Sequence, residues 1–384
     1  MIEYFITYFI YDNLIGRLVF RKGGGTMTLT EASLNTLSDN FNDLEPRYQT
    51  KQPLVVATAK NILVDVMQFR RSAELQSACD VATCDQCASP HLSKIITAVS
   101  KGEPVTFVLP AFPGKSPNPS KVLGPLPDMA ERCALEFLQS LNDRIKRHYS
   151  PGARIILASD GRVFSDVVGL RDEDVTAYQN EISKMIETLG LNSISTFNLE
   201  ELYHSESFDE MRAHLMDAHG ESVETLKASV SRGKFLDSSI EDQESHRLYL
   251  GITRFLVEDA MMPGQTKSRS SIQKECRVRA YSVIQRSKAW GELVERQFPD
   301  AVRLSIHPQA CGSKKLGIKL IEPDNWATPW HGVAVLVGGR YILLKRAQAE
   351  AIGAHLVTRF GRPSHYVLTN KEEILKLQGA LSEA

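Results

Sequence analysis

The segments PVTFVL (residues 104–109), RIILA (154–158) and NSISTF (192–197) decide the fold class of this chain. The first is a short apolar run rich in β-branched residues, which predicts a buried strand, and the other two are predicted as the next two strands. Between them, apolar residues recur every three or four positions at 129–145 and 175–189, which predicts two amphipathic helices. Because strands that alternate with helices form parallel sheets, we expect an α/β fold with an open parallel sheet flanked by helices.

Two longer segments follow the predicted strands. Residues 208–300 carry many charges and read mostly as helix, so we predict a large helical segment that covers the sheet. Residues 302–346 switch to short strand-like runs. These runs fit either a terminal β element or an antiparallel addition to the sheet.

The chain has no internal repeat and no low-complexity linker, which favours one large domain. We predict that this domain spans residues 27–384, with its sheet in about residues 100–200 and a C-terminal β-rich element in about residues 302–384. Residues 1–26 fit either an added element of the fold or an extension that precedes Met27, and we predict the extension.

Composition excludes several classes of protein. The 384 residues include 45 Lys plus Arg and 46 Asp plus Glu, so no basic excess is available to neutralise nucleic-acid phosphates. No run of about 18 apolar residues predicts a membrane span. The N-terminus lacks the basic segment of a signal peptide, and six cysteines fit a reducing compartment. We therefore expect a cytoplasmic protein without nucleic-acid or membrane partners.

Three cysteines cluster with the spacing C-x4-C-x2-C, which is typical of part of a zinc or iron–sulfur site. The cluster comprises Cys79, Cys84 and Cys87, with His91 just beyond it. A fourth ligand would have to come from a distant cysteine such as Cys133 or Cys276. Three thiols without an evident fourth do not close a site, so we predict no metal and keep a metal enzyme as an alternative.

The loop after the first predicted strand has four prolines in ten residues, at 110–119, which makes it stiff. Lys115 and Ser116 lie where α/β folds bind anions, beyond the carboxyl end of a strand. The loop has neither the P-loop spacing nor a dinucleotide fingerprint. It therefore predicts an anion-binding loop, with a rigid surface turn as the alternative.

The second strand is followed by two carboxylates and an arginine, Asp160, Arg162 and Asp166. An arginine beside carboxylates can form a plain ion pair. It can also bind a phosphate or carboxylate while an aspartate transfers a proton. We favour the second interpretation, because both loops leave the same edge of the sheet.

A third group of candidates lies near the C-terminus. His307 ends a strand-like run before a proline and is a candidate acid/base. Lys314, Lys315 and Lys319 follow it. His331 lies beside Trp330, with Trp326 nearby, and this aromatic patch fits either stacking on an aromatic substrate or packing in the core.

Four strings match one known family in the same order along the chain. They are FVLPAFPGKSPNPSKVLGPLPDMAE (107–131), ILASDGRVFSD (156–166), RLSIHPQ (303–309) and TPWHGVAV (328–335). Through them the chain, from about residue 50 to 350, resembles the isonitrile (isocyanide) synthase family, also called the pyoverdine/dityrosine biosynthesis family.

This resemblance implies a Rossmann-like fold and a lyase-type reaction. The α-amino group of L-tyrosine or L-tryptophan becomes an isonitrile, and ribulose 5-phosphate supplies the added carbon from its C2. The amine condenses with the ketone, phosphate leaves and the sugar skeleton is cut. No metal or redox cofactor is implied. The product would pass to an iron- and 2-oxoglutarate-dependent oxygenase in a pathway of secondary metabolism.

Each demand of this chemistry has candidate residues. The phosphate needs cations, from Lys115, Arg162 and Lys314 or Lys315; the amino-acid carboxylate needs Arg303 or Lys319; proton transfer needs Asp160, Asp166 or His307. The alternative from another class is a binding protein that keeps the fold without catalysis.

Overall fold

The computed structural model describes residues 10–12, 17–22, 25–28, 51–71, 84–204, 206–235, 237–321 and 327–370. The chain divides into two compact units, residues 1–58 and residues 59–384. In the first unit, three short strands form an antiparallel sheet in the order β1-β2-β3. They are β1 (Ile10–Asp12), β2 (Arg17–Lys22) and β3 (Gly25–Thr28). The predicted boundary at residue 27 falls within β3.

The second unit is built on a five-stranded sheet in the order β6-β5-β4-β7-β8, and every neighbouring pair is parallel. Its strands are β4 (Val105–Pro110), β5 (Ala153–Ala158), β6 (Ile194–Phe197), β7 (Val302–Ser305) and β8 (Leu316–Gly317). This sheet confirms the predicted α/β class. The strand order reverses between β4 and β7, which is where open α/β sheets bind ligands.

Alternate side chains of β4 explain why both faces of the sheet are covered. Phe107 and Leu109 pack in one apolar cluster, whereas Val108 packs in another. The first cluster includes residues of α3 (Lys51–Met67), α4 (Asp85–Lys101), α5 (Met129–Ile145) and α7 (Asp172–Thr188). The second includes α8 (Phe208–His219) and α11 (Arg269–Gln297). The sheet is therefore a middle layer between two helical layers.

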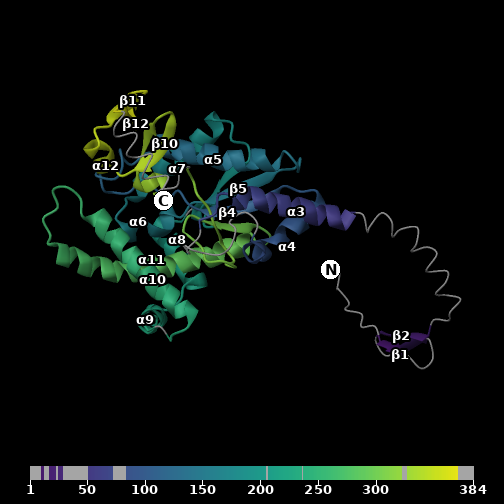
Figure 1. The fold of residues 1–384 in the computed structure, drawn as a ribbon. Coiled ribbons are helices and arrows are strands. Elements are labelled where there is room, and N and C mark those ends of the chain that lie inside the picture. The colour runs from purple at the N-terminus through teal and green to yellow at the C-terminus, as the bar shows by residue number, and fades with distance from the viewer. Residues whose placement is uncertain are drawn as a thin grey trace. The chain divides into compact units, whose positions relative to one another are not determined.

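The predicted helical segment is confirmed as four helices. Between α8 and α11 lie α9 (Val223–Arg232) and α10 (Ile240–Ala260). Figure 1 shows α10 and α11 lying side by side. None of the helices in the described ranges is both long and apolar enough to cross a membrane.

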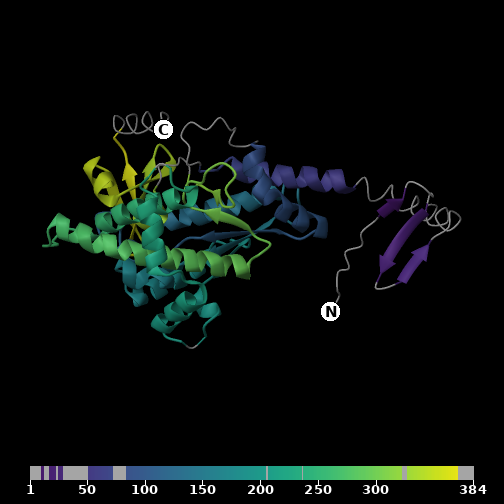
Figure 2. The ribbon, with the colours of Figure 1, turned by 90° about the horizontal axis from the view of Figure 1, so that it is seen from below.

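The C-terminal strands divide between two sheets. β7 and β8 join the main sheet in parallel, because Val302 and Leu304 are fully buried apolar residues that suit an internal strand. The remaining strands form a second, mixed sheet in the order β10-β9-β12-β11. It comprises β9 (Val333–Val337), β10 (Arg340–Leu344), β11 (His355–Arg359) and β12 (Arg362–Leu368), with α12 (Arg346–Ala351) between β10 and β11. Figure 2 shows this yellow sheet at one end of the unit.

Candidate active site

The segments that follow β4, β5 and β7 meet at the carboxyl edge of the main sheet. β4 lies between β5 and β7, so its loop lies between theirs. Phe112, in the loop after β4, has a left-handed backbone with φ of 60°. A bulky residue rarely adopts this conformation, so the surrounding contacts must hold the loop in place.

Lys115 is the central anchor of this loop. Its ammonium lies 2.9 Å from Asp128 Oδ2 and 2.8 Å from Glu131 Oε2, and donates to the carbonyl oxygen of Pro329 at 3.0 Å. Burial alone would lower the pKa of Lys115, but the two carboxylates outweigh it and raise that pKa. An ammonium has three donors, and all three are engaged here. Lys115 therefore fastens the loop to the start of α5 and has no donor left for a phosphate.

Asp259, near the end of α10, holds the next part of the loop. Ser116 Oγ and Lys121 Nζ both donate to Asp259 Oδ1, at 2.7 and 2.6 Å. The Ser116 amide donates to the carbonyl oxygen of Trp330 at 2.8 Å. Sequence reasoning identified Ser116 but missed Lys121 and Asp259, because neither lies beside a strand end.

His331 approaches the same carboxylate from the short 3₁₀ helix η2 (Pro329–His331). Its Nε2 lies 3.9 Å from Asp259 Oδ2, and its Nδ1 shares a hydrogen bond of 2.9 Å with Thr328 Oγ1. Burial lowers the pKa of His331 to about 4, so the ring is neutral at neutral pH.

Trp330 is enclosed in the core rather than open to a ligand. Its side chain is 2% exposed, and its ring centroid lies 5.3 Å from that of Phe112. This geometry matches the core-packing alternative for the aromatic patch. Trp326 lies outside the described residues.

Asp160 is held at the edge by a helix that sequence reasoning took for a loop. Helix α6 (Gly161–Val168) begins directly after it. A side chain at Gly161 would collide with the Pro113 carbonyl oxygen, so only glycine lets α6 start this close to the β4 loop. Asp160 Oδ1 is buried and has no hydrogen-bond partner in the described structure. Burial raises the pKa of Asp160 to about 7, against the opposing effect of Arg303.

Arg303, on β7, interacts electrostatically with Asp160, and the described residues show no ion pair between them. Its Nη1 is buried and finds no hydrogen-bond partner among the residues described. Burial lowers the pKa of Arg303 to about 10, while Asp160 and Glu295 oppose that shift. A buried guanidinium nitrogen and a buried carboxyl oxygen, neither with a hydrogen-bond partner among the described residues, therefore belong to groups within electrostatic range of each other.

Lys315 and His307 extend this group of charges. Lys315 is exposed, and desolvation by its surroundings and repulsion from Arg303 lower its pKa. Within the described part of the chain it makes no ion pair. The pKa of His307 is lowered by desolvation of its ring and by Arg71 and Lys315. His307 also lies within electrostatic range of His331.

Arg71 supports the segment that carries His307, and sequence reasoning missed it. Its Nη1 donates to the carbonyl oxygen of Ile306 at 2.6 Å. Its backbone amide donates to Gly317, and its carbonyl oxygen accepts from Gln309. Arg71 lies outside every motif of the sequence, so no local signal marks it.

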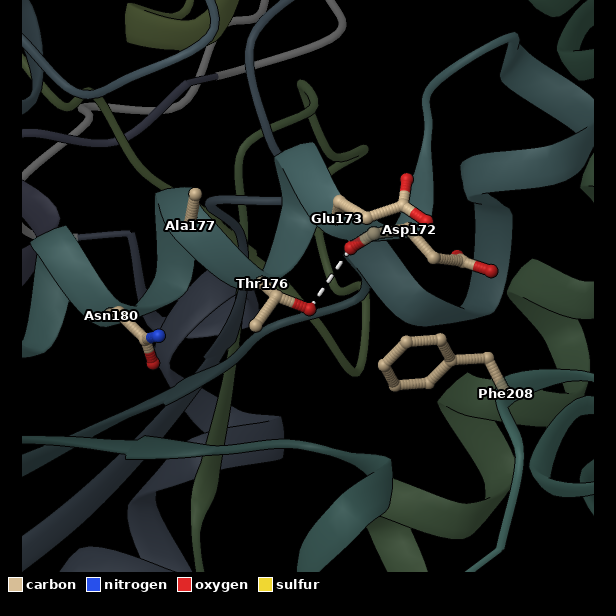
Figure 3. A pocket seen from close by; sticks show the side chains of 6 residues that line it. All are labelled: Asp172, Glu173, Thr176, Ala177, Asn180 and Phe208. Carbon is tan, nitrogen blue, oxygen red and sulfur yellow. Dashed lines mark hydrogen bonds between the residues drawn. The ribbon is translucent and has the colours of Figure 1, made fainter.

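Arg162 is engaged by a carboxylate that follows β6, Glu200 of the short 3₁₀ helix η1 (Leu199–Glu201). Its Nη2 lies 2.8 Å from Glu200 Oε1, and its guanidinium carbon lies 4.5 Å from the ring centroid of Phe208. Phe208 also lines an open hollow of ≈ 420 Å³ on the outer side of α7 (Figure 3), whose lining residues are Asp172, Glu173, Thr176, Ala177, Asn180 and Phe208. Two carboxylates in this lining do not favour a phosphate.

The remaining candidates have other surroundings. The carboxylate of Asp166 accepts a bidentate pair of hydrogen bonds from the guanidinium of Arg286 on α11. Lys314 is exposed and Lys319 is half-buried, and neither makes an ion pair in the described residues. Successive electrostatic interactions link Asp160, Arg303, Lys315, His307 and His331, whereas Arg162 and Asp166 are paired with Glu200 and Arg286.

Two of the clustered cysteines are joined by a third one that the sequence did not suggest. Cys311 Sγ lies 3.1 Å from Cys87 Sγ and 3.6 Å from Cys84 Sγ. The distant partners expected from the sequence, Cys133 and Cys276, lie on α5 and α11 and are not part of this group. Cys79 lies outside the described residues.

Comparisons with known proteins agree with the resemblance read from the sequence. The family described as pyoverdine/dityrosine biosynthesis protein matches residues 95–357. The chain is 44% identical over 314 residues to L-tryptophan isonitrile synthase AmbI2 of Fischerella ambigua, covering 82% of this chain and 92% of that protein. It is 42% identical over 314 residues to an L-tyrosine isonitrile synthase of Pseudomonas aeruginosa, covering 80% of this chain and 93% of that protein.

A solved structure is similar over the same part of the chain. The crystal structure of the PvcA protein from Pseudomonas aeruginosa superposes with a TM-score of 0.75 at 41% identity, covering 81% of this chain and all of that one. Matches of this length and identity, on a sheet that carries the shared strings at its carboxyl edge, establish that the chain belongs to the pyoverdine/dityrosine biosynthesis protein family.

Proposed function

We propose that this protein is an isonitrile synthase that converts the α-amino group of L-tyrosine or L-tryptophan to an isonitrile, with ribulose 5-phosphate as the carbon source. The relatives support the reaction class, because their names describe isonitrile synthases of these two amino acids. The observation that carries the proposal is the pair formed by Asp160 and Arg303: each has a buried polar atom without a hydrogen-bond partner among the described residues, and the two groups interact electrostatically.

This pair matches the two charges of a free amino acid. The α-carboxylate suits the guanidinium of Arg303, whose planar donors can bind both carboxylate oxygens. The α-ammonium suits the carboxyl group of Asp160. An amino acid bound between them would supply hydrogen-bond partners to the buried Oδ1 of Asp160 and the buried Nη1 of Arg303. This would account for two buried polar atoms that find no partner among the described residues.

The phosphate of the second substrate would bind to Lys315. This ammonium lies within electrostatic range of Arg303 and His307 and has no ion-pair partner among the described residues. Lys115 and Arg162 are already engaged by carboxylates, so we assign them positioning roles instead. Lys314 and Lys319 remain candidates for further contacts with the sugar phosphate.

Proton transfer would fall to Asp160 and His307. Imine formation needs a neutral amine, and Asp160, with a pKa of about 7, can accept the proton of the bound ammonium near neutral pH. The carbinolamine then loses water, and an acid must protonate the departing hydroxyl group. His307 is exposed and interacts electrostatically with Lys315. We therefore assign it that step and the proton transfers of carbon–carbon cleavage.

The proposal has two further parts that rest on the family resemblance. The reaction would need no metal or redox cofactor. The isonitrile product would be the substrate of an iron- and 2-oxoglutarate-dependent oxygenase. We assign Asp166 a positioning role, because it fastens α6 to α11 through Arg286.

The test is incubation of the purified protein with ribulose 5-phosphate labelled with carbon-13 at C2 and either L-tyrosine or L-tryptophan. Mass spectrometry should detect an isonitrile that carries the label. Asp160→Asn should abolish the product, whereas the matched Asp166→Asn should retain most of it. A folded protein that forms no labelled product from either amino acid contradicts the proposal.

A further inference from the structure

Three thiol groups from two distant segments meet beside the candidate active site. Cys84 and Cys87 lie at the start of α4, and Cys311 lies in the loop between β7 and β8. Their sulfur atoms all lie within 4.8 Å of one another. Neither the family comparison nor the proposed reaction gives these cysteines a role.

The spacing of the sulfur atoms fits one tetrahedral metal ion. A zinc–sulfur bond of about 2.3 Å places two sulfur ligands about 3.8 Å apart in a tetrahedron. The observed separations from Cys311 are 3.1 Å to Cys87 and 3.6 Å to Cys84. An iron–sulfur cluster interposes several atoms between its ligands and would hold the sulfur atoms farther apart. The geometry therefore favours a single ion.

The surroundings suit a negatively charged metal–thiolate group. Zinc with three thiolates carries one net negative charge. The guanidinium of Arg70 donates to Cys87 Sγ and would compensate that charge. Cys84 is the N-cap residue of α4 and makes no side-chain cap hydrogen bond, so its sulfur is available at the helix end that stabilises negative charge.

A small void lies beside Cys87, one of the three thiols. A void of ≈ 10 Å³ is lined in part by Cys87, His91 and Gly312. This volume is about that needed for one water molecule. His91 follows Cys87 by four residues on α4, which places both on one face of the helix.

We propose that Cys84, Cys87 and Cys311 bind one zinc ion, with a water molecule in the fourth position. Each thiol releases its proton to solvent and binds the ion through a sulfur lone pair, so no oxidant or reductant is involved. The ion takes no part in isonitrile formation. It joins α4 to the loop that carries His307 and Lys315, and so fixes that loop.

Metal analysis of the purified protein tests this directly. The protein is purified under reducing conditions without a metal-affinity step, loaded with zinc sulfate and dialysed. We expect about one zinc per chain. Cys311→Ser should reduce the zinc content at least tenfold, whereas the matched Cys133→Ser should retain it. Cobalt loaded in place of zinc should give a sulfur-to-cobalt charge-transfer band in the wild type and not in Cys311→Ser.

A second measurement needs no variant, in case Cys311→Ser does not fold. A mercurial reagent titrated into the zinc-loaded wild type should release the ion, detected by a chromophoric chelator, as the cluster thiols react. In a separate sample of the metal-loaded protein that has not met the mercurial, thiol titration in denaturant should find all six cysteines reduced. Wild type that retains no zinc, equal zinc in the two serine variants, or a disulfide between Cys87 and Cys311 overturns the proposal.

Discussion

Asp160→Asn is expected to stabilise the protein at pH 8 while abolishing its activity. The buried carboxyl group has its pKa raised from 3.8 to about 7, so the folded state resists its ionisation. Between these two pH values the folded state binds more protons than the unfolded state. The stability of the wild type therefore falls as the pH rises from about 4 to about 7. Asparagine cannot ionise and avoids this loss.

The size of the effect follows from the pKa. A shift of about 3 units corresponds to roughly 4 kcal/mol of unfavourable ionisation above pH 7. The attraction of Arg303 is already contained in this pKa. A buried asparagine amide that lacks partners also costs free energy, which offsets part of the gain. We expect the variant to be more stable by about 1–3 kcal/mol at pH 8, equivalent to a rise of roughly 1–4 °C in Tm.

Thermal unfolding of both proteins at pH 5 and pH 8 measures this difference. The gain should be clearly larger at pH 8 than at pH 5, because at pH 5 the wild type has lost stability over only about 1.2 of the roughly 3 pH units between the two pKa values. Glu131 also has its pKa raised to about 7, but it titrates in both proteins and cancels in the comparison. Asp166→Asn is the control, because its carboxylate is ion-paired, and it should lower stability slightly at both pH values. A stability difference that does not change with pH would refute the reasoning.

Three further changes test other parts of the site. His307→Gln should lower kcat by about 10²–10⁴-fold with Tm unchanged, since glutamine cannot transfer a proton; a folded variant with a near-normal single-turnover rate would exclude the role. Arg303→Ala should raise the KM for the amino acid more than the KM for ribulose 5-phosphate, and the opposite order in steady-state kinetics would reassign it. Lys115→Ala should destabilise the protein by about 3–5 kcal/mol in chemical unfolding, because Asp128 and Glu131 stay buried without a cation; a stable variant with weakened sugar-phosphate binding would return Lys115 to the phosphate site.

The first strands of the central sheet were predictable because short apolar runs in the local sequence indicate buried strands. The segments 104–109 and 154–158 were expected as strands, and β4 and β5 fall within one residue of them. The place of β7 between β4 and β8 could not be predicted, because strand neighbours are chosen by long-range packing. Helix α6 was missed because its eight residues are too few for a clear apolar period.

The candidate site was predictable to the extent that it follows strand ends. Asp160 and His307 are found by this rule because both come directly after strands. Lys115 satisfies the same rule, yet its partner Pro329 lies 214 residues away, and no local pattern reveals that it is enclosed. Cys311 was missed for the same reason, since it lies 224 residues from Cys87.

The position of β7 in the sheet has a consequence for synthesis of the chain. β4 ends at Pro110, but its neighbour β7 is not complete until Ser305. A ribosome that adds about 5–20 residues per second needs roughly 10–40 s to make the intervening segment. Throughout that interval β4 has open backbone groups on the side that β7 later covers, and for most of it α11 is not yet available to cover Val108. Nascent chains that stop before β7 should therefore aggregate or bind chaperones, and release from the chaperone should coincide with the emergence of residues 302–305.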